Sequence, residues 1–160
     1  MVESTAKIEE FWGEFIRVTS KDPELKYSGH YHFGEDEGTS MKLLAYVWDG
    51  KKKATTNSIF KFKNSGQILP KQGEYYIITN FKGDPYMVVQ NNDVKFMPFK
   101  DMTFDLCKLE GEVDSLESWR EKYLGNFNGE SEKLGYEFNE DMEIIFEIFD
   151  VVYRKSFPVV

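Results

Sequence analysis

The chain has 160 residues, a length that suits one compact domain and is too short for two ordinary ones. Apolar residues make up 41% of the chain and aromatic residues 16%, which excludes a disordered chain. Twenty basic residues against 28 acidic ones give a net charge of −8, which argues against indiscriminate coating of nucleic acid or of an anionic membrane.

No segment of the sequence suggests targeting or insertion into a membrane. The first residues show no cationic region followed by an apolar run, and nowhere do 18 apolar residues follow one another. The sequence therefore predicts a cytoplasmic protein without a membrane partner. It does not indicate an oligomeric state.

The first part of the chain carries two helical patterns. Residues 5–18 place Ile8, Phe11 and Phe15 at the spacing of one apolar helix face. Residues 19–38 contain glycines and a proline, and we expect a loop there. Thr39 is a suitable N-cap for a second helix that ends near Gly50.

The middle of the chain has the composition of strands. A β-prone run follows Thr55 and ends at Ser65-Gly66. Further strands are predicted over 75–79 and 86–89, joined by a turn. A continuation over 94–97 is predicted beyond a polar bulge at Asn91-Asn92.

The last part of the chain combines helices with one long strand. We expect a short helical stretch near Thr103, an amphipathic helix from Leu116 to Leu124, and a surface loop over 125–141. Residues 142–153 are apolar on both faces, which is typical of a central strand. The order predicts a single α+β domain over residues 1–160 with a mainly antiparallel sheet that can close on itself.

Charge is concentrated in one segment. Residues 50–71 contain six lysines and no acid. Two interpretations stay open: solvated lysines on strands and loops, or a patch that faces an anion such as phosphate, a nucleotide or RNA. Phe60 and Phe62 lie between these lysines and could stack on bases.

Several catalytic and metal-binding motifs are incomplete. The Gly50-Lys51-Lys52 triplet resembles the end of a phosphate-binding loop, but Ala45 stands where that motif needs glycine. His30 and His32 have no recognisable triad partner and are best explained as exposed loop histidines. The single cysteine, Cys107, excludes an intramolecular disulfide, and its apolar neighbourhood indicates a core residue. We therefore predict no metal and no cofactor.

Residues 50–55 fit the pattern G-x-K-x-x-T, directly after a predicted helix and before a strand. This placement resembles the longer bacterial branch of the ASCH domain family. Other segments occur in the order of that family: Phe11-Trp12, Phe33-Gly34, Pro70-Lys71 with Gly73, Pro98-Phe99, Glu110-Gly111-Glu112, Ser118-Trp119-Arg120 and 149–153.

The resemblance implies a PUA-like fold, a small, mainly antiparallel β-barrel flanked by helices. Such folds commonly bind RNA or nucleosides. One bacterial branch of the family hydrolyses 4-acetylcytidine, and matching by motif makes Lys52 the base, Thr55 the nucleophile and Glu110 the acid. Lys51, Lys53 and Arg120 are the neighbouring candidates for ligand binding.

Three functions follow as hypotheses. The first is an amidohydrolase acting on an acylated nucleoside or a related small amide through Lys52, Thr55 and Glu110. The second is a non-catalytic module that binds RNA or a nucleotide through the lysine-rich segment 50–71. The third is a metal-assisted ribonuclease that uses acids such as Asp101 and Asp105 with Glu110. The spacing alone favours structural roles, for example Glu110 paired with Lys108 at a helix end.

Overall fold

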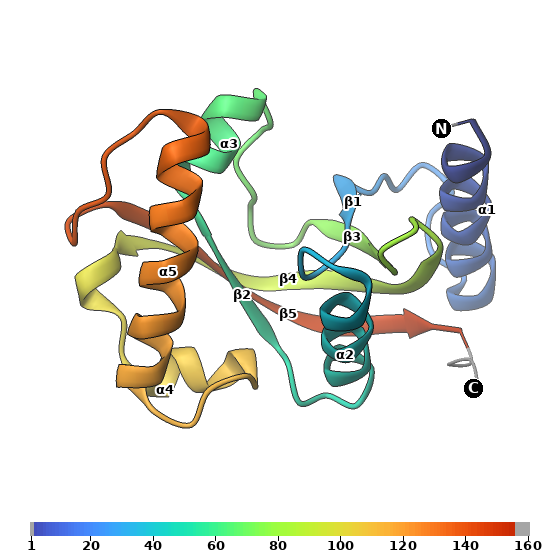
Figure 1. Ribbon diagram of the computed structural model, residues 1–160. Coiled ribbons are helices and arrows are strands. Elements are labelled where there is room, and N and C mark those ends of the chain that lie inside the picture. Colours follow the sequence, from blue (N-terminus) through green and yellow to red (C-terminus); the bar gives the residue numbers. More distant parts are fainter. Residues whose placement is uncertain (1, 156–160) are drawn as a thin grey trace. The chain divides into compact units, whose positions relative to one another are not determined.

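The computed structural model describes residues 2–155, with side chains from residue 5 onward (Figure 1). The chain forms two compact units. Unit 1 comprises Met1–Lys52, Gly73–Asn91 and Phe149–Val160, and unit 2 comprises Lys53–Gln72 and Asn92–Ile148. Each unit is described by itself below. The expectation of one domain over residues 1–160 stays a prediction.

The described residues form α-helices, strands and two short 3₁₀ helices. In chain order they are α1 (Val2–Thr19), β1 (Gly29–Tyr31), α2 (Glu37–Trp48), β2 (Ala54–Ser58), α3 (Ile59–Ser65), β3 (Tyr75–Thr79), β4 (Pro85–Pro98), η1 (Phe99–Asp101), α4 (Phe104–Cys107), η2 (Lys108–Glu110), α5 (Leu116–Leu134) and β5 (Glu143–Arg154). None of the helices in this part of the chain has both the length and the apolar character that a membrane crossing requires.

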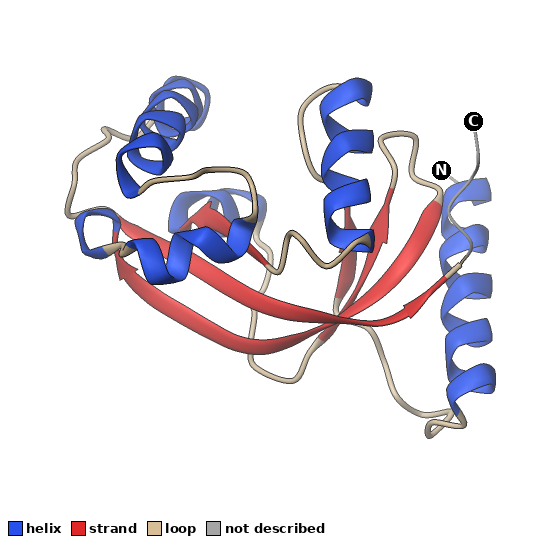
Figure 2. Ribbon diagram, turned by 90° about the horizontal axis from the view of Figure 1, so that it is seen from below, coloured by secondary structure: helices blue, strands red, loops and turns tan. Residues whose placement is uncertain are grey.

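The strands form one sheet in the order β1-β3-β4-β5-β2. β1 runs parallel to β3, whereas the β3–β4 and β2–β5 pairs are antiparallel. The two longest strands, β4 and β5, contribute residues to both units. Figure 2 shows the strands in red and the helices in blue. The α+β class and the mainly antiparallel sheet are therefore confirmed.

Each unit has its own apolar interior. In unit 1, one cluster packs α1 against β3 and β4, and a second packs α2 against the same two strands. In unit 2, one cluster joins β2, the η1–α4 segment, α5 and β5, with Trp119, Phe99 and Phe146 among its fully buried members. The buried face of α1 contains Ile8, Phe11 and Phe15, as the sequence predicts.

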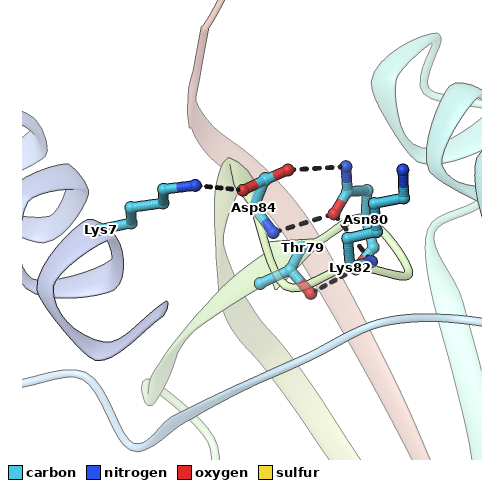
Figure 3. A network of polar contacts seen from close by, with 5 residues as sticks. All are labelled: Lys7, Thr79, Asn80, Lys82 and Asp84. Atoms are coloured by element: carbon cyan, nitrogen blue, oxygen red, sulfur yellow. Dashed lines mark hydrogen bonds and ion pairs between the residues drawn. The ribbon is translucent and has the colours of Figure 1, made fainter. Parts of the chain in front are cut away.

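A polar network also connects α1 to the turn between β3 and β4 (Figure 3). Lys7 of α1 forms an ion pair with Asp84 over 3.0 Å. The side-chain oxygen of Asn80 accepts hydrogen bonds from the backbone nitrogens of Lys82 and Asp84, which shapes the turn. The amide of Asn80 donates to the second carboxylate oxygen of Asp84.

Residues 59–65 form a helix, so the strand predicted beyond residue 58 is wrong. Ser58 ends β2 and caps α3 by accepting a hydrogen bond from the backbone nitrogen of Lys61. Gly66 ends α3 in the left-handed conformation with φ of 71°. These two caps outweigh the β propensity of the residues between them.

Two further predictions are corrected. Asp36, rather than Thr39, is the N-cap of α2, and Thr39 donates its backbone N–H to the Asp36 carboxylate. The predicted strand over 94–97 is part of β4, and the bulge expected at Asn91-Asn92 stays a prediction. α5 extends to Leu134 because Phe127 is buried in the core of unit 2, so most of the predicted loop after residue 124 is helical.

Candidate functional site

The G-x-K-x-x-T segment begins with a tight turn at the end of α2. Gly50 adopts a φ of 79°, in the left-handed region that favours glycine. The backbone nitrogens of Lys51 and Lys52 both donate to the carbonyl oxygen of Tyr46, over 2.8 and 3.0 Å. The turn therefore fixes the chain direction immediately before β2.

The motif lysine, Lys52, is the last residue of unit 1 and is only 2% exposed. Its Nζ atom lies 5.2 Å from the centre of the Phe33 ring. Lysine is rarely buried in proteins unless it is paired or has a function. The neighbouring Lys51 is exposed, and its ammonium group lies 4.1 Å from the centre of the Tyr46 ring.

The motif threonine, Thr55, belongs to unit 2 and is the second residue of β2, with 9% of its surface exposed. Side chains alternate between the two faces of a strand, so Thr55 points away from the face that carries Ala54 and Thr56. In the antiparallel register Thr55 stands opposite Glu147, and Thr56 stands opposite Phe146.

Glu110 is the centre of a buried polar cluster in unit 2, where it is 1% exposed. One of its oxygens accepts hydrogen bonds from the Thr56 hydroxyl, over 2.8 Å, and from the indole nitrogen of Trp119, over 2.7 Å. The other accepts from the Tyr123 hydroxyl. The structure thus brings Glu110 together with Thr56 rather than with Thr55.

Several local features place Glu110 at this point. The backbone nitrogen of Lys53 donates to the carbonyl oxygen of Leu109 over 2.7 Å, which ties the start of β2 to η2. Trp119 and Tyr123 are four residues apart on α5 and therefore project from the same face of that helix. Glu110 connects these three elements of unit 2.

The electrostatics of the cluster keep its neighbours protonated. Burial, reinforced by the Glu110 carboxylate, raises the pKa of Tyr123 well above its usual value. Burial, again with Glu110 nearby, raises the pKa of Cys107 to about 11. Tyr123 therefore acts as a hydrogen-bond donor, and Cys107 is a core thiol, as the sequence indicates.

The remaining charged candidates lie at the surface of unit 2. Lys53 is exposed. Arg120 forms an ion pair with Glu140 over 2.6 Å, and its guanidinium carbon lies 5.6 Å from the centre of the Phe99 ring. Lys108 pairs with Asp105 over 3.3 Å, so the expected pairing of Lys108 with Glu110 is wrong.

The lysine-rich segment is exposed over most of its length in unit 2. Lys53, Lys61 and Lys63 are exposed and form no ion pair with the described residues. Phe60 stacks on Tyr136 with ring centres 4.1 Å apart, so one of its faces is already covered. Four of the five lysines elsewhere in unit 2 pair with carboxylates, namely Lys95, Lys100, Lys108 and Lys122, whereas Lys133 is exposed and forms no ion pair with the described residues.

Acidic, histidine and cysteine side chains do not converge in the part of the chain that the structure describes. No group of three or more of them has the arrangement needed to hold a metal ion there. Asp101 and Asp105 are exposed, whereas Glu110 is buried.

The sequence analysis did not name four buried polar side chains near the motif positions of unit 2. Thr56, Trp119 and Tyr123 are donors to Glu110, and Glu147 is a buried carboxylate on β5. A signal existed for Trp119 and Tyr123, because a buried indole N–H or phenol O–H usually needs an acceptor. No comparable signal marks Glu147, because strand register is not visible in one sequence.

The chain is similar to known proteins in sequence pattern and in structure. A crystal structure of an ASCH domain from Lactobacillus crispatus JV V101 is 26% identical and gives a TM-score of 0.83, over 93% of this chain and 96% of that one. A protein from Enterococcus faecalis V583 is 27% identical with a TM-score of 0.82, over 95% of this chain and 90% of that one. No protein with curated annotation shows significant similarity to the chain.

The structural likeness extends over nearly the whole of each chain and agrees with the α+β, PUA-like fold expected from the sequence motifs. The family model described as ASCH domain matches residues 29–153, which include both the G-x-K-x-x-T segment and Glu110. The chain therefore belongs to the ASCH domain family.

Proposed function

We propose that the protein binds RNA or a nucleotide, with the exposed part of the lysine-rich segment as its anion-binding surface. The observation that carries this proposal is that three lysines of the lysine-rich segment, Lys53, Lys61 and Lys63, are exposed and form no ion pair with the described residues. Their charge is not neutralised by neighbouring carboxylates and is available to phosphate groups. The PUA-like fold supports the proposal, since such folds commonly bind RNA.

The geometry of Glu110 favours binding over catalysis. A carboxyl group that acts as an acid must present a proton to its substrate. Glu110 instead accepts hydrogen bonds from Thr56, Trp119 and Tyr123, which is the opposite role. We therefore assign Glu110 a positioning role, in which it holds β2 against α5.

The net charge of −8 limits the size of the ligand. An acidic protein repels a long polyanion outside its one cationic surface. The proposal is accordingly a short single-stranded RNA or a nucleotide rather than an extended duplex.

The test compares two triple variants with the same change in charge. Lys53, Lys61 and Lys63 are replaced by Gln in the first variant. The control replaces three lysines of unit 2 that already form ion pairs: Lys95, Lys100 and Lys108. Binding of a fluorescent ten-nucleotide RNA of mixed sequence is followed by anisotropy over a range of salt concentrations.

The wild type is expected to bind with a strong salt dependence. Losing three phosphate contacts reduces the slope of log affinity against log salt by about 2, whereas the control variant keeps the wild-type slope. Binding that is absent, independent of salt, or equally reduced in both variants contradicts the proposal.

A second candidate is the amidohydrolase acting on an acylated nucleoside, with Lys52 as base and Thr55 as nucleophile. It is favoured by the burial of both motif side chains, which are 2% and 9% exposed. Hydroxyl and amine groups that are withdrawn from water in this way are common among activated nucleophiles and bases.

This candidate is tested with purified protein and 4-acetylcytidine, with cytidine measured by chromatography. An amidohydrolase gives product in the wild type and at least a hundredfold less in Thr55→Val or Lys52→Met, because each loses a reacting group. Full turnover in Thr55→Val, or no product from folded wild type at high concentration, contradicts this function. The metal-assisted ribonuclease has no observation in its favour.

A further inference from the structure

The short helix α3 carries two lysines of the proposed anion-binding surface, Lys61 and Lys63, and is only 7 residues long. An isolated helix of this length is not stable in water, so tertiary contacts must hold α3 in place. Lys61 is itself oriented, because its ammonium group donates to the side-chain oxygen of Asn57 over 3.1 Å. Asn57 is uncharged, so this contact orients the ammonium group without neutralising it. The position of α3 therefore decides where these positive charges lie.

A carboxylate on α5, Glu130, attaches the start of α3 to α5 within unit 2. The two helices lie side by side near the C-terminal end of α5 (Figure 1). Ser58, the N-cap residue of α3, donates its hydroxyl to Oε1 of Glu130. The same hydroxyl accepts a hydrogen bond from the backbone nitrogen of Lys61 over 3.2 Å. One side chain therefore both caps α3 and connects it to Glu130.

Tyr136, which follows α5 in the chain, makes a second connection between Glu130 and α3. Its hydroxyl donates to Oε1 of Glu130 over 3.0 Å. Its ring stacks on Phe60 of α3, with ring centres 4.1 Å apart and planes inclined by 12°. Burial, with the Glu130 carboxylate nearby, raises the pKa of Tyr136 to about 12, so the hydroxyl stays protonated and donates. Glu130 thus holds both the cap of α3 and the ring that covers one of its aromatic side chains.

We propose that Glu130 is a positioning residue for RNA binding, which holds α3 in the orientation that presents Lys61 and Lys63 to phosphate groups. This inference rests on the proposed function and identifies what prepares its anion-binding surface for the ligand. A surface that is ordered before the ligand arrives loses less conformational entropy on binding than a mobile one. Glu130 does not touch the RNA in this proposal and acts only through α3.

The negative charge of Glu130 makes the direction of the change in affinity decisive. A carboxylate close to the lysines repels phosphate groups, so on electrostatic grounds alone its removal should tighten RNA binding. If Glu130 positions α3, its removal should weaken binding, because the RNA must then order the helix and its lysines. The two accounts therefore predict opposite changes.

The test measures binding of the fluorescent ten-nucleotide RNA by anisotropy. Glu130→Leu removes the acceptor together with the charge and is expected to weaken binding roughly fivefold. Glu130→Gln removes the charge but keeps an amide oxygen with two lone pairs, which can accept from Ser58 and Tyr136. It is expected to bind at least as tightly as the wild type. The slope of log affinity against log salt should stay at the wild-type value in both variants, because no lysine is lost.

Glu132→Leu is the matched control, because it removes the same charge from an exposed position on α5, and it is expected not to weaken binding. Thermal unfolding verifies that each variant is folded at the temperature of the binding assay. If Glu130→Leu does not fold, Tyr136→Leu decides. It removes the ring that stacks on Phe60 and one donor to Glu130 without a change in charge, and it is expected to weaken binding roughly threefold.

The outcomes separate the positioning role from the proposed function. The positioning role is overturned, and RNA binding is left standing, if Glu130→Leu binds as tightly as the wild type or more tightly. The same conclusion follows if Glu130→Gln is as weak as Glu130→Leu, if Glu132→Leu loses as much affinity, or if a deciding Tyr136→Leu binds like the wild type. No binding of the RNA by the wild type overturns the proposed function and the positioning role with it.

Discussion

A single carboxylate, Glu110, satisfies three buried donors that come from β2 and α5. Two of its donors, Trp119 and Tyr123, form part of the core of unit 2. Buried polar groups are tolerated only when they are hydrogen-bonded, so the cluster is stable as a set and costly to break in part. Loss of Glu110 would leave the Thr56, Trp119 and Tyr123 donors without this acceptor.

We predict that Glu110→Gln lowers the free energy of unfolding by about 2–4 kcal/mol, because the new amide group faces donors instead of accepting from them. Tyr123→Phe removes one donor and leaves two, so it should lower the free energy by about 1–2 kcal/mol. Urea unfolding at neutral pH measures both. Glu117→Gln, an exposed position on α5, is the control and should change little. If Glu110→Gln is as stable as the wild type, the stabilising role assigned to Glu110 is contradicted.

The difference between Thr55 and Thr56 shows how much depends on one position in a strand. The motif matched from sequence names Thr55, yet Thr56 donates to Glu110. Adjacent residues of a strand point to opposite faces, so a sequence pattern can identify the strand without identifying which face of it meets a given partner.

At the scale of elements, one glycine precedes α2 and another follows it, and the two have different surroundings. Gly34 precedes it with φ of 81°, and Gly50 follows it with φ of 79°. A Cβ atom added at Gly34 would lie 2.9 Å from the backbone nitrogen of Ser40, whereas no atom lies within 4 Å of one added at Gly50. The entry to α2 therefore requires glycine for space as well as for conformation.

This contrast predicts unequal effects of the same substitution. Gly50→Ala should lower the free energy of unfolding by about 1 kcal/mol through backbone strain alone. Gly34→Ala adds a steric overlap with backbone and should lower it by roughly 3 kcal/mol. Differential scanning calorimetry of the two variants provides the comparison. Equal losses of unfolding free energy in the two variants would show that the contact between the added Cβ atom at Gly34 and the Ser40 backbone does not affect stability.

The attachment of α1 to the β3–β4 turn depends on pH. Lys7 hydrogen-bonds Asp84 and, with Asn80, lowers the pKa of that carboxyl in the folded protein. A lowered pKa means that the contribution to stability is present above the unfolded pKa, about 3.9, and is lost as pH falls through the folded value.

Lys7→Gln tests this attachment. Both side chains of the ion pair are half exposed, so the variant should lose at most about 1 kcal/mol at pH 7. The difference between wild type and variant should shrink as pH falls through the lowered pKa of Asp84, because the protonated carboxyl no longer pairs with Lys7. Denaturant unfolding at pH 7 and at a series of acidic pH values measures it, and a difference that does not depend on pH would contradict the assigned role.

At the scale of the whole molecule, the sequence predicts what depends on periodicity and misses what depends on tertiary contacts. The apolar face of α1 and the long strand β5 follow directly from spacing. The end of α5 does not, because the glycines and asparagines after residue 124 disfavour a helix that burial of Phe127 nevertheless stabilises.

The residues of the candidate site likewise include some that the sequence motifs name and some that only the strand register brings together. Lys52 in unit 1 and Glu110 in unit 2 are both buried, and the catalytic roles matched to them by motif stay predictions. The pairing of Thr55 with Glu147 depends on the register of β2 against β5, and no local pattern in either strand encodes it. Register is decided by which apolar faces are buried, and that is a property of the assembled sheet.

The division into two compact units has a consequence for how the gene can be rearranged. The chain passes from one unit to the other after Lys52, Gln72, Asn91 and Ile148, so neither unit is a continuous stretch of sequence. No single truncation yields either unit alone, and recombination at one breakpoint would exchange parts of both. We therefore expect that neither half of the chain, expressed alone, contains a complete unit.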